Sequence, residues 1–343
     1  MSSASAFYNS YMLNRKFDSR PLYWTVVLSF AAVLLYLSLR GIRWSEVWRT
    51  VSHANIRLLI LAFGVSSIAL MLRALRWRVL LKSRADVGIA TAFWALCTGY
   101  FGNNFLPARA GEIIRSFLIS ARTGLSKTFV LTTALAERLA DAVSLVIISS
   151  IVLLTLRTRP GWFNVAAKPF AIVGLCGAAC IAVLPPMERI WEKLLRALPI
   201  PHTLSSRMVA LLEQILVGLR SFHDMGRLAR FTMLTGIIWF IDATAALVSM
   251  RALGFKMPLG LAFLLITGLG LGSALPATPG YVGIYQFVTV SVLTPFGFAK
   301  SDAIAYSFLS QAMQYVFFGF YGLLALSRQR GISLRTITQQ GAA

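Results

Sequence analysis

The segment FLPARAGEIIR, Phe105 to Arg115, interrupts a strongly apolar stretch of the chain with a proline, a glycine, two arginines and a glutamate. A second segment, ALPATPGYVGIYQ from Ala274 to Gln286, repeats the Leu-Pro-Ala phrase, again with a glycine three positions beyond the alanine, and carries almost no charge. Proline lacks the backbone N–H that a helix interior needs. Each phrase is therefore predicted to break a helix inside apolar surroundings.

The rest of the composition is that of a polytopic membrane protein. Of the 343 residues, 57% are hydrophobic and 13% are charged, and the apolar residues occur in blocks. A helix crosses the hydrocarbon layer with about 20 apolar residues. We therefore expect an all-α membrane bundle with six full crossings near 22–39, 57–74, 128–156, 165–184, 231–252 and 303–326. The shorter blocks 89–106 and 259–294 are predicted to be re-entrant.

The formal charge of +21 does not indicate nucleic-acid binding, because the basic residues flank the apolar blocks in short connections. Placing the N-terminal segment 1–21 in the cytoplasm puts two thirds of the 33 lysines and arginines on the cytoplasmic side. We therefore expect a bacterial inner-membrane protein with one transmembrane domain, 22–326, and a cytoplasmic tail, 327–343. The mixed segment 187–230 is predicted to form amphipathic helices on the cytoplasmic face, covering lipid rather than docking a partner.

The two halves of the domain are predicted to be an inverted repeat. In each half a crossing precedes a broken block and a second crossing follows it, and the predicted directions are opposite. The phrases MLRAL (71–75) and SMRAL (249–253) end the two entry crossings. Inverted repeats with broken helices are typical of carriers.

The first broken phrase favours an anionic guest. A helix that restarts after Pro107 exposes free N–H groups, which attract anions, and Arg109 adds a permanent positive charge. Arg115 lies three residues beyond Glu112, on a neighbouring part of the new helix. A phosphate-bearing lipid headgroup fits this arrangement, and the alternative is a simple Glu112–Arg115 pair on a surface helix.

Glu137, Arg138 and Asp141 form a second charged cluster within a predicted crossing. An ionised side chain at mid-bilayer costs about 2.5–3.5 kcal/mol on insertion scales, so all three are expected to face protein or a wet cavity. Two acids against one base leave a surplus negative charge, which could pair with Arg73, Arg76 or Arg109. Asp242 is the intramembrane acid of the second half, and for both halves a structural and a transport role stay open.

The second broken phrase offers backbone groups and neutral donors, which suits a sugar or a glycerol group. Its candidate residues are Pro276, Pro279, Gly280, Gly283, Tyr285 and Gln286. The three histidines are scattered and the cysteines lie in apolar segments, so we expect no metal, no cofactor and no catalytic group.

Four motifs in this order make the chain resemble the lysylphosphatidylglycerol synthase transmembrane domain, a flippase-like family. They are RALRW (73–77), NFLPARAGEIIR (104–115), ERLAD (137–141) and PATPGYVGIYQ (276–286). The resemblance implies two re-entrant helices around a lipid-accessible cavity and transfer of a lipid between leaflets. Tyr281 and Gln286 depart from the family pattern, in which Gly-Gly and a closing Glu are frequent, and this puts the headgroup in doubt. The chain ends about fifteen residues after its last predicted crossing, so lysyl transfer is not expected.

These observations favour a lipid translocase rather than an enzyme, with an anionic phospholipid or a lipid-linked sugar as its ligand. A subunit of a lipid-glycosylating or hopanoid-modifying system and a scaffold that recruits soluble enzymes through 187–230 are the alternatives, and a homo-oligomer is possible. The predicted headgroup site comprises Arg73, Arg76, Asn104, Pro107, Arg109, Gly111, Glu112, Arg115, Pro276, Pro279, Gly280, Gly283 and Gln286. The predicted charge network comprises Glu137, Arg138, Asp141 and Asp242.

Replacing Arg109 tests the anionic site directly. In liposomes, the purified protein is expected to expose a fluorescent anionic phospholipid to an outer-leaflet quencher, and Arg109→Ala is expected to abolish this exposure because it removes the permanent positive charge. Equal quenching with and without the protein would reject transfer of the tested lipid.

Overall fold

A computed structural model describes residues 19–106, 110–155, 224–273 and 278–328, together with isolated positions between 172 and 222. Within these segments all regular structure is helical, which confirms the predicted all-α fold. The helices are α2 (Ser19–Leu39), α3 (Trp44–Ser52), α4 (Ile56–Leu81), α5 (Ile89–Phe105), α6 (Ala110–Thr123), α7 (Lys127–Thr155), α11 (Met225–Ala252), α12 (Leu259–Gly272), α13 (Ile284–Leu293) and α14 (Lys300–Arg328), with short 3₁₀ turns η1 (Pro279–Tyr281) and η2 (Thr294–Phe296).

The exposed surface of the bundle is apolar, as a lipid environment requires. Helices α4, α11 and α14 are each long and apolar enough to cross a membrane, and α2 with α3 forms a further pair bent by 89°. Val26, Ile60 and Val316 are among many large apolar side chains that point outward from these helices. Such a surface would be unstable in water, so the protein is an integral membrane protein.

Several predicted segments fall outside the described residues. They are the crossing 165–184, nearly all of the terminal segments 1–21 and 327–343, and most of 187–230. The last six residues of 187–230 form the first part of α11, and the rest of that prediction stays untested. That helix begins at Met225, since the Asp224 side chain accepts a hydrogen bond from the Arg227 N–H and caps it.

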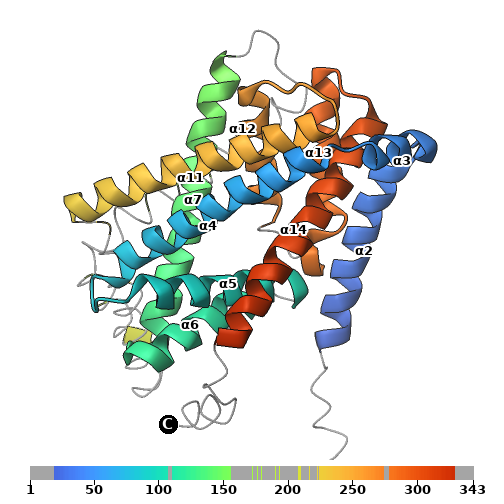
Figure 1. Cartoon of the computed structure of the whole chain (residues 1–343). Helices are drawn as coiled ribbons and strands as arrows, with labels where there is room; N and C mark the ends of the chain where they lie inside the picture. The colour runs from blue at the N-terminus through green and yellow to red at the C-terminus, as the bar shows by residue number, and fades with distance from the viewer. Residues whose placement is uncertain are drawn as a thin grey trace, which may run out of the picture.

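The predicted broken block 259–294 forms a helical hairpin, whereas the block 89–106 forms only the first arm of one. Helix α5 ends at Phe105, α6 begins at Ala110, and the two helices pack against each other. Helix α12 ends at Gly272 and, after η1, the chain returns as α13, which packs on α12. Figure 1 shows the α5–α6 hairpin toward the lower end of the molecule and α12 toward the upper end, so the hairpins come from opposite sides.

The helix contacts have the twofold pattern that the predicted inverted repeat requires. Helix α4 packs on α5 and α7 in the first half, as α11 packs on α12 and α14 in the second. The hairpin arm α6 contacts α7, and α13 contacts α14. Between the halves, α14 packs on α5, α7 packs on α12, and α4 packs on α11. These contacts between described helices therefore occur in matching pairs in the two halves.

The two hairpins contact each other, because helix α5 of the first packs against turn η1 of the second. The ring of Phe105, at the end of α5, lies 5.5 Å from that of Tyr315 on α14. A Cβ atom on Gly280 would lie only 1.6 Å from the hydroxyl of the same tyrosine. Gly280 has a φ of +69°, which glycine adopts without strain. The second turn is therefore fitted around an aromatic side chain that also contacts the first hairpin.

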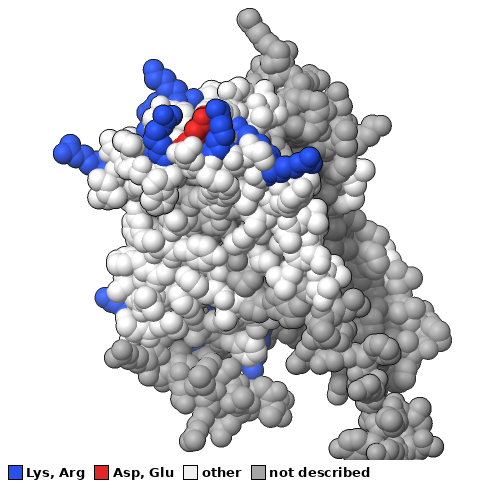
Figure 2. Space-filling view, turned by 90° about the vertical axis from the view of Figure 1, so that its right-hand side faces the viewer, with Lys and Arg blue, Asp and Glu red and all other residues white. Residues whose placement is uncertain are grey.

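Helix α3 marks one edge of the apolar surface. Trp44 and Trp48 are exposed beside Arg43 and Arg49, a combination typical of the membrane–water interface. Figure 2 shows lysines and arginines gathered at the upper end of this face, where Figure 1 places α3, above a broad band of uncharged residues. The N-terminal end of α2 and the C-terminal end of α14 lie at the opposite, lower end (Figure 1). Which end faces the cytoplasm stays a prediction.

Gly111 allows the α5–α6 hairpin to close. A Cβ atom at this position would lie 1.8 Å from the backbone oxygen of Gly99. We expect Gly111→Ala to separate the two arms and to lower the unfolding free energy by at least the roughly 1–3 kcal/mol that overpacking costs. The measurement is the apparent melting temperature of the purified protein in detergent.

Gly64→Ala is the matched control, because Gly64 lies within α4 and a Cβ atom there would meet no atom within 4 Å. Alanine favours a helix by about 1 kcal/mol over glycine, so this variant should melt at the same temperature or slightly higher. Equal melting temperatures for Gly111→Ala and the unchanged protein would contradict the close packing.

Candidate functional site

The bundle contains a partly open cavity of about 410 Å³ between its two halves. This volume lies within the range of small-molecule and headgroup sites. Aliphatic and aromatic side chains form much of the wall. The polar and hydrogen-bonding residues in the wall are Ser66, Arg73, Tyr100, Asn103, Asn104, Glu112, Arg138, Asp141, Trp239, Asp242, Ser249, Ser273, Tyr281, Tyr285, Tyr306, Ser310 and Gln314. They come from both hairpins and from α4, α7, α11 and α14.

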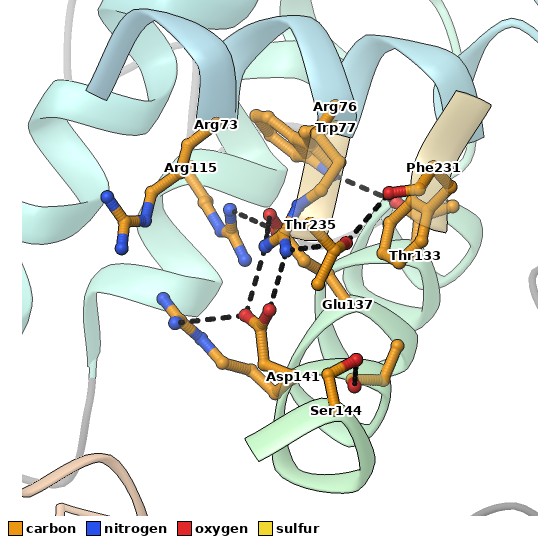
Figure 3. A network of polar contacts seen from close by, with 12 residues as sticks. Arg73, Arg76, Trp77, Arg115, Thr133, Glu137, Asp141, Ser144, Phe231 and Thr235 are labelled. Atoms are coloured by element: carbon orange, nitrogen blue, oxygen red, sulfur yellow. Dashed lines mark hydrogen bonds and ion pairs between the residues drawn. The ribbon is translucent and has the colours of Figure 1, made fainter. Parts of the chain in front are cut away.

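Arg76 on α4 forms the centre of a buried ion-pair network behind this wall (Figure 3). Its guanidinium donates to both carboxylate oxygens of Asp141, over 2.6 and 3.0 Å, and to Oε1 of Glu137, over 2.8 Å. It also donates to the hydroxyl of Thr235 on α11, over 3.1 Å. Only 1% of the Arg76 side chain is exposed. This one side chain therefore ties α4 to α7 and α11.

Arg115 joins the first hairpin to the same network. Its Nε donates to Oε2 of Glu112 over 2.7 Å, and its Nη1 donates to Oε2 of Glu137 over 3.1 Å. The guanidinium also lies over the ring of Trp77, 4.6 Å from the centroid. The predicted Glu112–Arg115 pair therefore exists, but it is buried in the bundle and not on a surface helix.

Neither Arg76 nor Arg115 lines the cavity, although both were predicted to contact a headgroup. Carboxylates surround their guanidinium groups, so we assign both arginines a positioning role. Arg138, which was predicted to balance charge, lines the cavity instead, with 31% of its side chain exposed. It pairs with Oε1 of Glu112 at 3.0 Å and lies 5.3 Å from the centroid of the Tyr100 ring.

Arg73 and Asp242 form an ion pair in the cavity wall that links α4 to α11. Nη1 of Arg73 donates to Oδ1 of Asp242 over 3.3 Å, and Nη2 donates to Oδ2. Arg73 also lies over the ring of Trp239. Figure 3 shows Arg73 pointing away from the Arg76 network. This pair joins the two halves of the bundle within the cavity wall.

The charges around the cavity balance. The described residues of the two networks contain four arginines and four carboxylates, namely Arg73, Arg76, Arg115, Arg138, Glu112, Glu137, Asp141 and Asp242. Each carboxylate has an arginine partner. Buried ions are tolerated when they are paired and hydrogen-bonded in this way.

The second hairpin is held by amides where the first is held by ions. Oε1 of Gln286 accepts from the N–H of Gly283 over 2.8 Å, and its Nε2 donates to Oε1 of Gln311 on α14 over 2.7 Å. Gln311 in turn donates to the backbone oxygen of Gly280 over 2.6 Å. Gln286 is fully buried and does not line the cavity. Its polar groups therefore stabilise the turn between α12 and α13 and do not face a ligand.

Three predicted site residues, Pro107, Arg109 and Pro276, lie outside the described residues. Asn104 is buried and accepts a hydrogen bond from Gln314 on α14, which ties the first hairpin to the second half. Sequence reasoning missed Gln311, Gln314, Tyr100 and Trp239. The signal for the two glutamines was their position within a crossing, where polar side chains are rare and often functional. The aromatic residues had no comparable signal.

Breaking the buried network should destabilise the bundle far more than breaking a surface pair. Arg76→Gln leaves two buried carboxylates without full compensation, which costs about 3–5 kcal/mol. Arg43→Gln is the control, because Arg43 pairs with Glu46 at 2.9 Å while 74% of its side chain is exposed, and exposed pairs contribute about 0–1 kcal/mol. The melting temperatures and yields of the two variants in detergent are the measurement, and equal losses would contradict the structural role of Arg76.

Comparison with known proteins agrees with this architecture. The chain is 24% identical to a UPF0104 membrane protein of Methanothermobacter thermautotrophicus, over 88% of this chain and 92% of that protein. It is 22% identical to a UPF0104 membrane protein of Pyrococcus horikoshii, over 85% and 92%. It is also 22% identical to the glycosyltransferase AglD of Haloferax volcanii, over 84% of this chain and half of that protein.

No solved structure matches the chain. The profile of the lysylphosphatidylglycerol synthase TM region matches residues 24–322. That match covers both hairpins, the cavity and the ion-pair network, and the protein therefore belongs to this family of membrane domains.

Proposed function

We propose that this protein binds a membrane lipid by its polar headgroup in the central cavity and moves the lipid between the two leaflets. The observation that carries the proposal is the cavity of about 410 Å³ between two hairpins from opposite sides, whose wall combines apolar side chains with charged and hydroxyl-bearing ones. Carriers bind their substrates near the bilayer midplane at the interface of such repeats. The apolar outer surface allows the acyl chains to stay in lipid while the headgroup passes through the protein.

The cavity wall supplies groups that can replace the water around a headgroup. The side chains of Arg73 and Arg138 line the cavity and each stays partly exposed beside its carboxylate partner. Asn104, Gln314 and the cavity hydroxyl groups add neutral donors and acceptors. A phosphate-bearing headgroup and a lipid-linked sugar are the two candidate classes of ligand.

A role in a lipid-modifying system is the second candidate. It is favoured by the similarity to the glycosyltransferase AglD, of which this chain covers one half. In that case the cavity would present a lipid to a separate catalytic domain. A protein of this kind needs to bind the lipid but does not need to move it across the bilayer.

Filling the cavity should stop lipid transfer. Ser66 on α4 lines the cavity, so Ser66→Trp places a large side chain in the headgroup path. We expect transfer of fluorescent lipids in proteoliposomes, measured with a quencher added outside, to slow at least tenfold. Both a fluorescent phosphatidylglycerol and a fluorescent glycolipid are assayed.

Ile68→Trp is the matched control, because Ile68 lies two residues further along the same helix and is exposed on the outer surface. This variant should transfer lipid at the unchanged rate and should melt at the unchanged temperature. Equal rates for Ser66→Trp and Ile68→Trp would contradict passage through the cavity. The absence of protein-dependent movement for both lipids would contradict translocation.

A further inference from the structure

We propose that the part of the headgroup held in the cavity is uncharged and rich in hydroxyl groups, as in a sugar or another polyol. This inference rests on the proposed function, because it names the ligand of the same cavity. Three independent features of the wall support it: the balance of its charges, two buried polar atoms without partners, and its aromatic surfaces.

The charge balance argues against a free anion in the cavity. Arg73 and Arg138, the described basic residues in the wall, are already paired with Asp242 and Glu112. Asp141 also lines the cavity, and its partner Arg76 lies behind the wall. A phosphate would therefore meet satisfied cations and three carboxylates. Placing an uncompensated charge in a site of low dielectric constant is costly, whereas a neutral hydroxyl group does not incur that cost.

Two buried polar atoms of cavity residues lack a hydrogen-bond partner. They are Oδ1 of Asn103, an acceptor, and Nε1 of Trp239, a donor. Asn103 lies on the first hairpin and Trp239 lies on α11, so the atoms belong to different parts of the wall. A buried polar atom without a partner costs about 1–3 kcal/mol. Both side chains line the cavity, but these two atoms have almost no accessible surface, so a ligand supplies their partners after a small movement of the side chains toward it.

The orientation of the Asn103 amide is fixed by its neighbour. Its Nδ2 donates to Oε1 of Glu112 over 3.2 Å. Turning the amide over would place Oδ1 against that carboxylate, which is repulsive. The unpartnered atom of Asn103 is therefore an acceptor and needs a donor.

A hydroxyl group can satisfy both atoms, because it donates and accepts. A fully ionised phosphate only accepts, so it could pair with Trp239 but would leave Asn103 without a partner. An ammonium group only donates and has the opposite defect. A polyol carries several hydroxyl groups at fixed spacing and can pair with both atoms at once.

The second hairpin adds aromatic surfaces to the wall. The rings of Tyr281 and Tyr285 line the cavity and stack with their centroids 5.7 Å apart at 20°. Tyr281 has a φ of +61°, an uncommon backbone conformation for a residue other than glycine. Such strain is concentrated at functional sites. The apolar C–H faces of a sugar ring can pack on tyrosine rings while its hydroxyl groups bond to polar side chains.

Equilibrium binding of three fluorescent lipids tests the inference. The probes are a monoglucosyl diacylglycerol, phosphatidylglycerol and plain diacylglycerol with the same acyl chains and label, and fluorescence anisotropy reports the dissociation constants. The protein is purified in a detergent without a sugar headgroup, because maltosides would compete. We expect the glucosyl lipid to bind at least tenfold more tightly than the other two.

Trp239→Phe removes the unpartnered N–H and keeps an aromatic ring. It should weaken binding of the glucosyl lipid about tenfold, the effect of losing one hydrogen bond, and should leave binding of diacylglycerol unchanged. Trp48→Phe is the control, because 75% of Trp48 is exposed on α3, away from the cavity. Asn103→Ala tests the acceptor in the same way. Melting temperatures identify variants that lose their fold.

Tighter binding of phosphatidylglycerol than of the glucosyl lipid would overturn the inference, as would a glucosyl-lipid affinity unchanged by both Trp239→Phe and Asn103→Ala. The proposed function is judged by the separate transfer assay. Transfer of phosphatidylglycerol that Ser66→Trp blocks, without selective binding of the glucosyl lipid, supports translocation and rejects the polyol. Selective binding of the glucosyl lipid, without movement of either lipid, supports the polyol site and rejects translocation.

Discussion

The structure depends on one carboxylate, that of Glu137, which is fully buried in an apolar bundle and shared between two arginines. One oxygen pairs with Arg76 on α4 and the other with Arg115 on the first hairpin. An ionised side chain inside a bilayer is costly unless it is fully paired. The position of α7 therefore fixes the positions of α4 and α6. Through Thr235, Arg76 extends the same constraint to α11.

The two halves of the repeat solve the same packing problem with different chemistry. In each half a side chain on the second hairpin arm bonds to a side chain on the crossing that follows, as Arg115 does with Glu137 and Gln286 does with Gln311. The first pair is ionic and the second is neutral. Separating an ion pair in a medium of low dielectric constant costs far more than separating two amides. The α12–α13 hairpin is thus held less tightly against its neighbour by this pair than the α5–α6 hairpin is.

Much of this architecture follows from local sequence. The Leu-Pro-Ala phrases place the breaks, because proline cannot continue a helix, and the charge of Glu137 and Asp141 requires an interior position. The local sequence does not indicate which arginines face the cavity and which are buried in the ion-pair network. Arg138 faces the cavity because successive residues of a helix point about 100° apart, so it turns away from the side of α7 that carries Glu137. Its role depends on how α7 is rotated against α4, which packing sets.

The local sequence also does not indicate which residues far apart in the chain form ion pairs. Arg73 pairs with Asp242 across 169 positions, and both lie in crossings whose relative placement comes only from the contact between α4 and α11. The symmetry of the repeat brings these two helices together at the centre of the molecule. A predicted inverted repeat thus indicates which helices meet, but the register between them decides which residues do.

The balance of charge also bears on how a headgroup could leave the cavity once bound. A transport site needs interactions strong enough for entry and weak enough for release, as in channels. Unpaired arginines in a bilayer would hold an anion tightly and would be costly when empty. Arginines that already have carboxylate partners offer only their remaining donor capacity. Pairing therefore lowers the cost of the empty cavity and limits the affinity of the filled one, as the proposed lipid transfer would require.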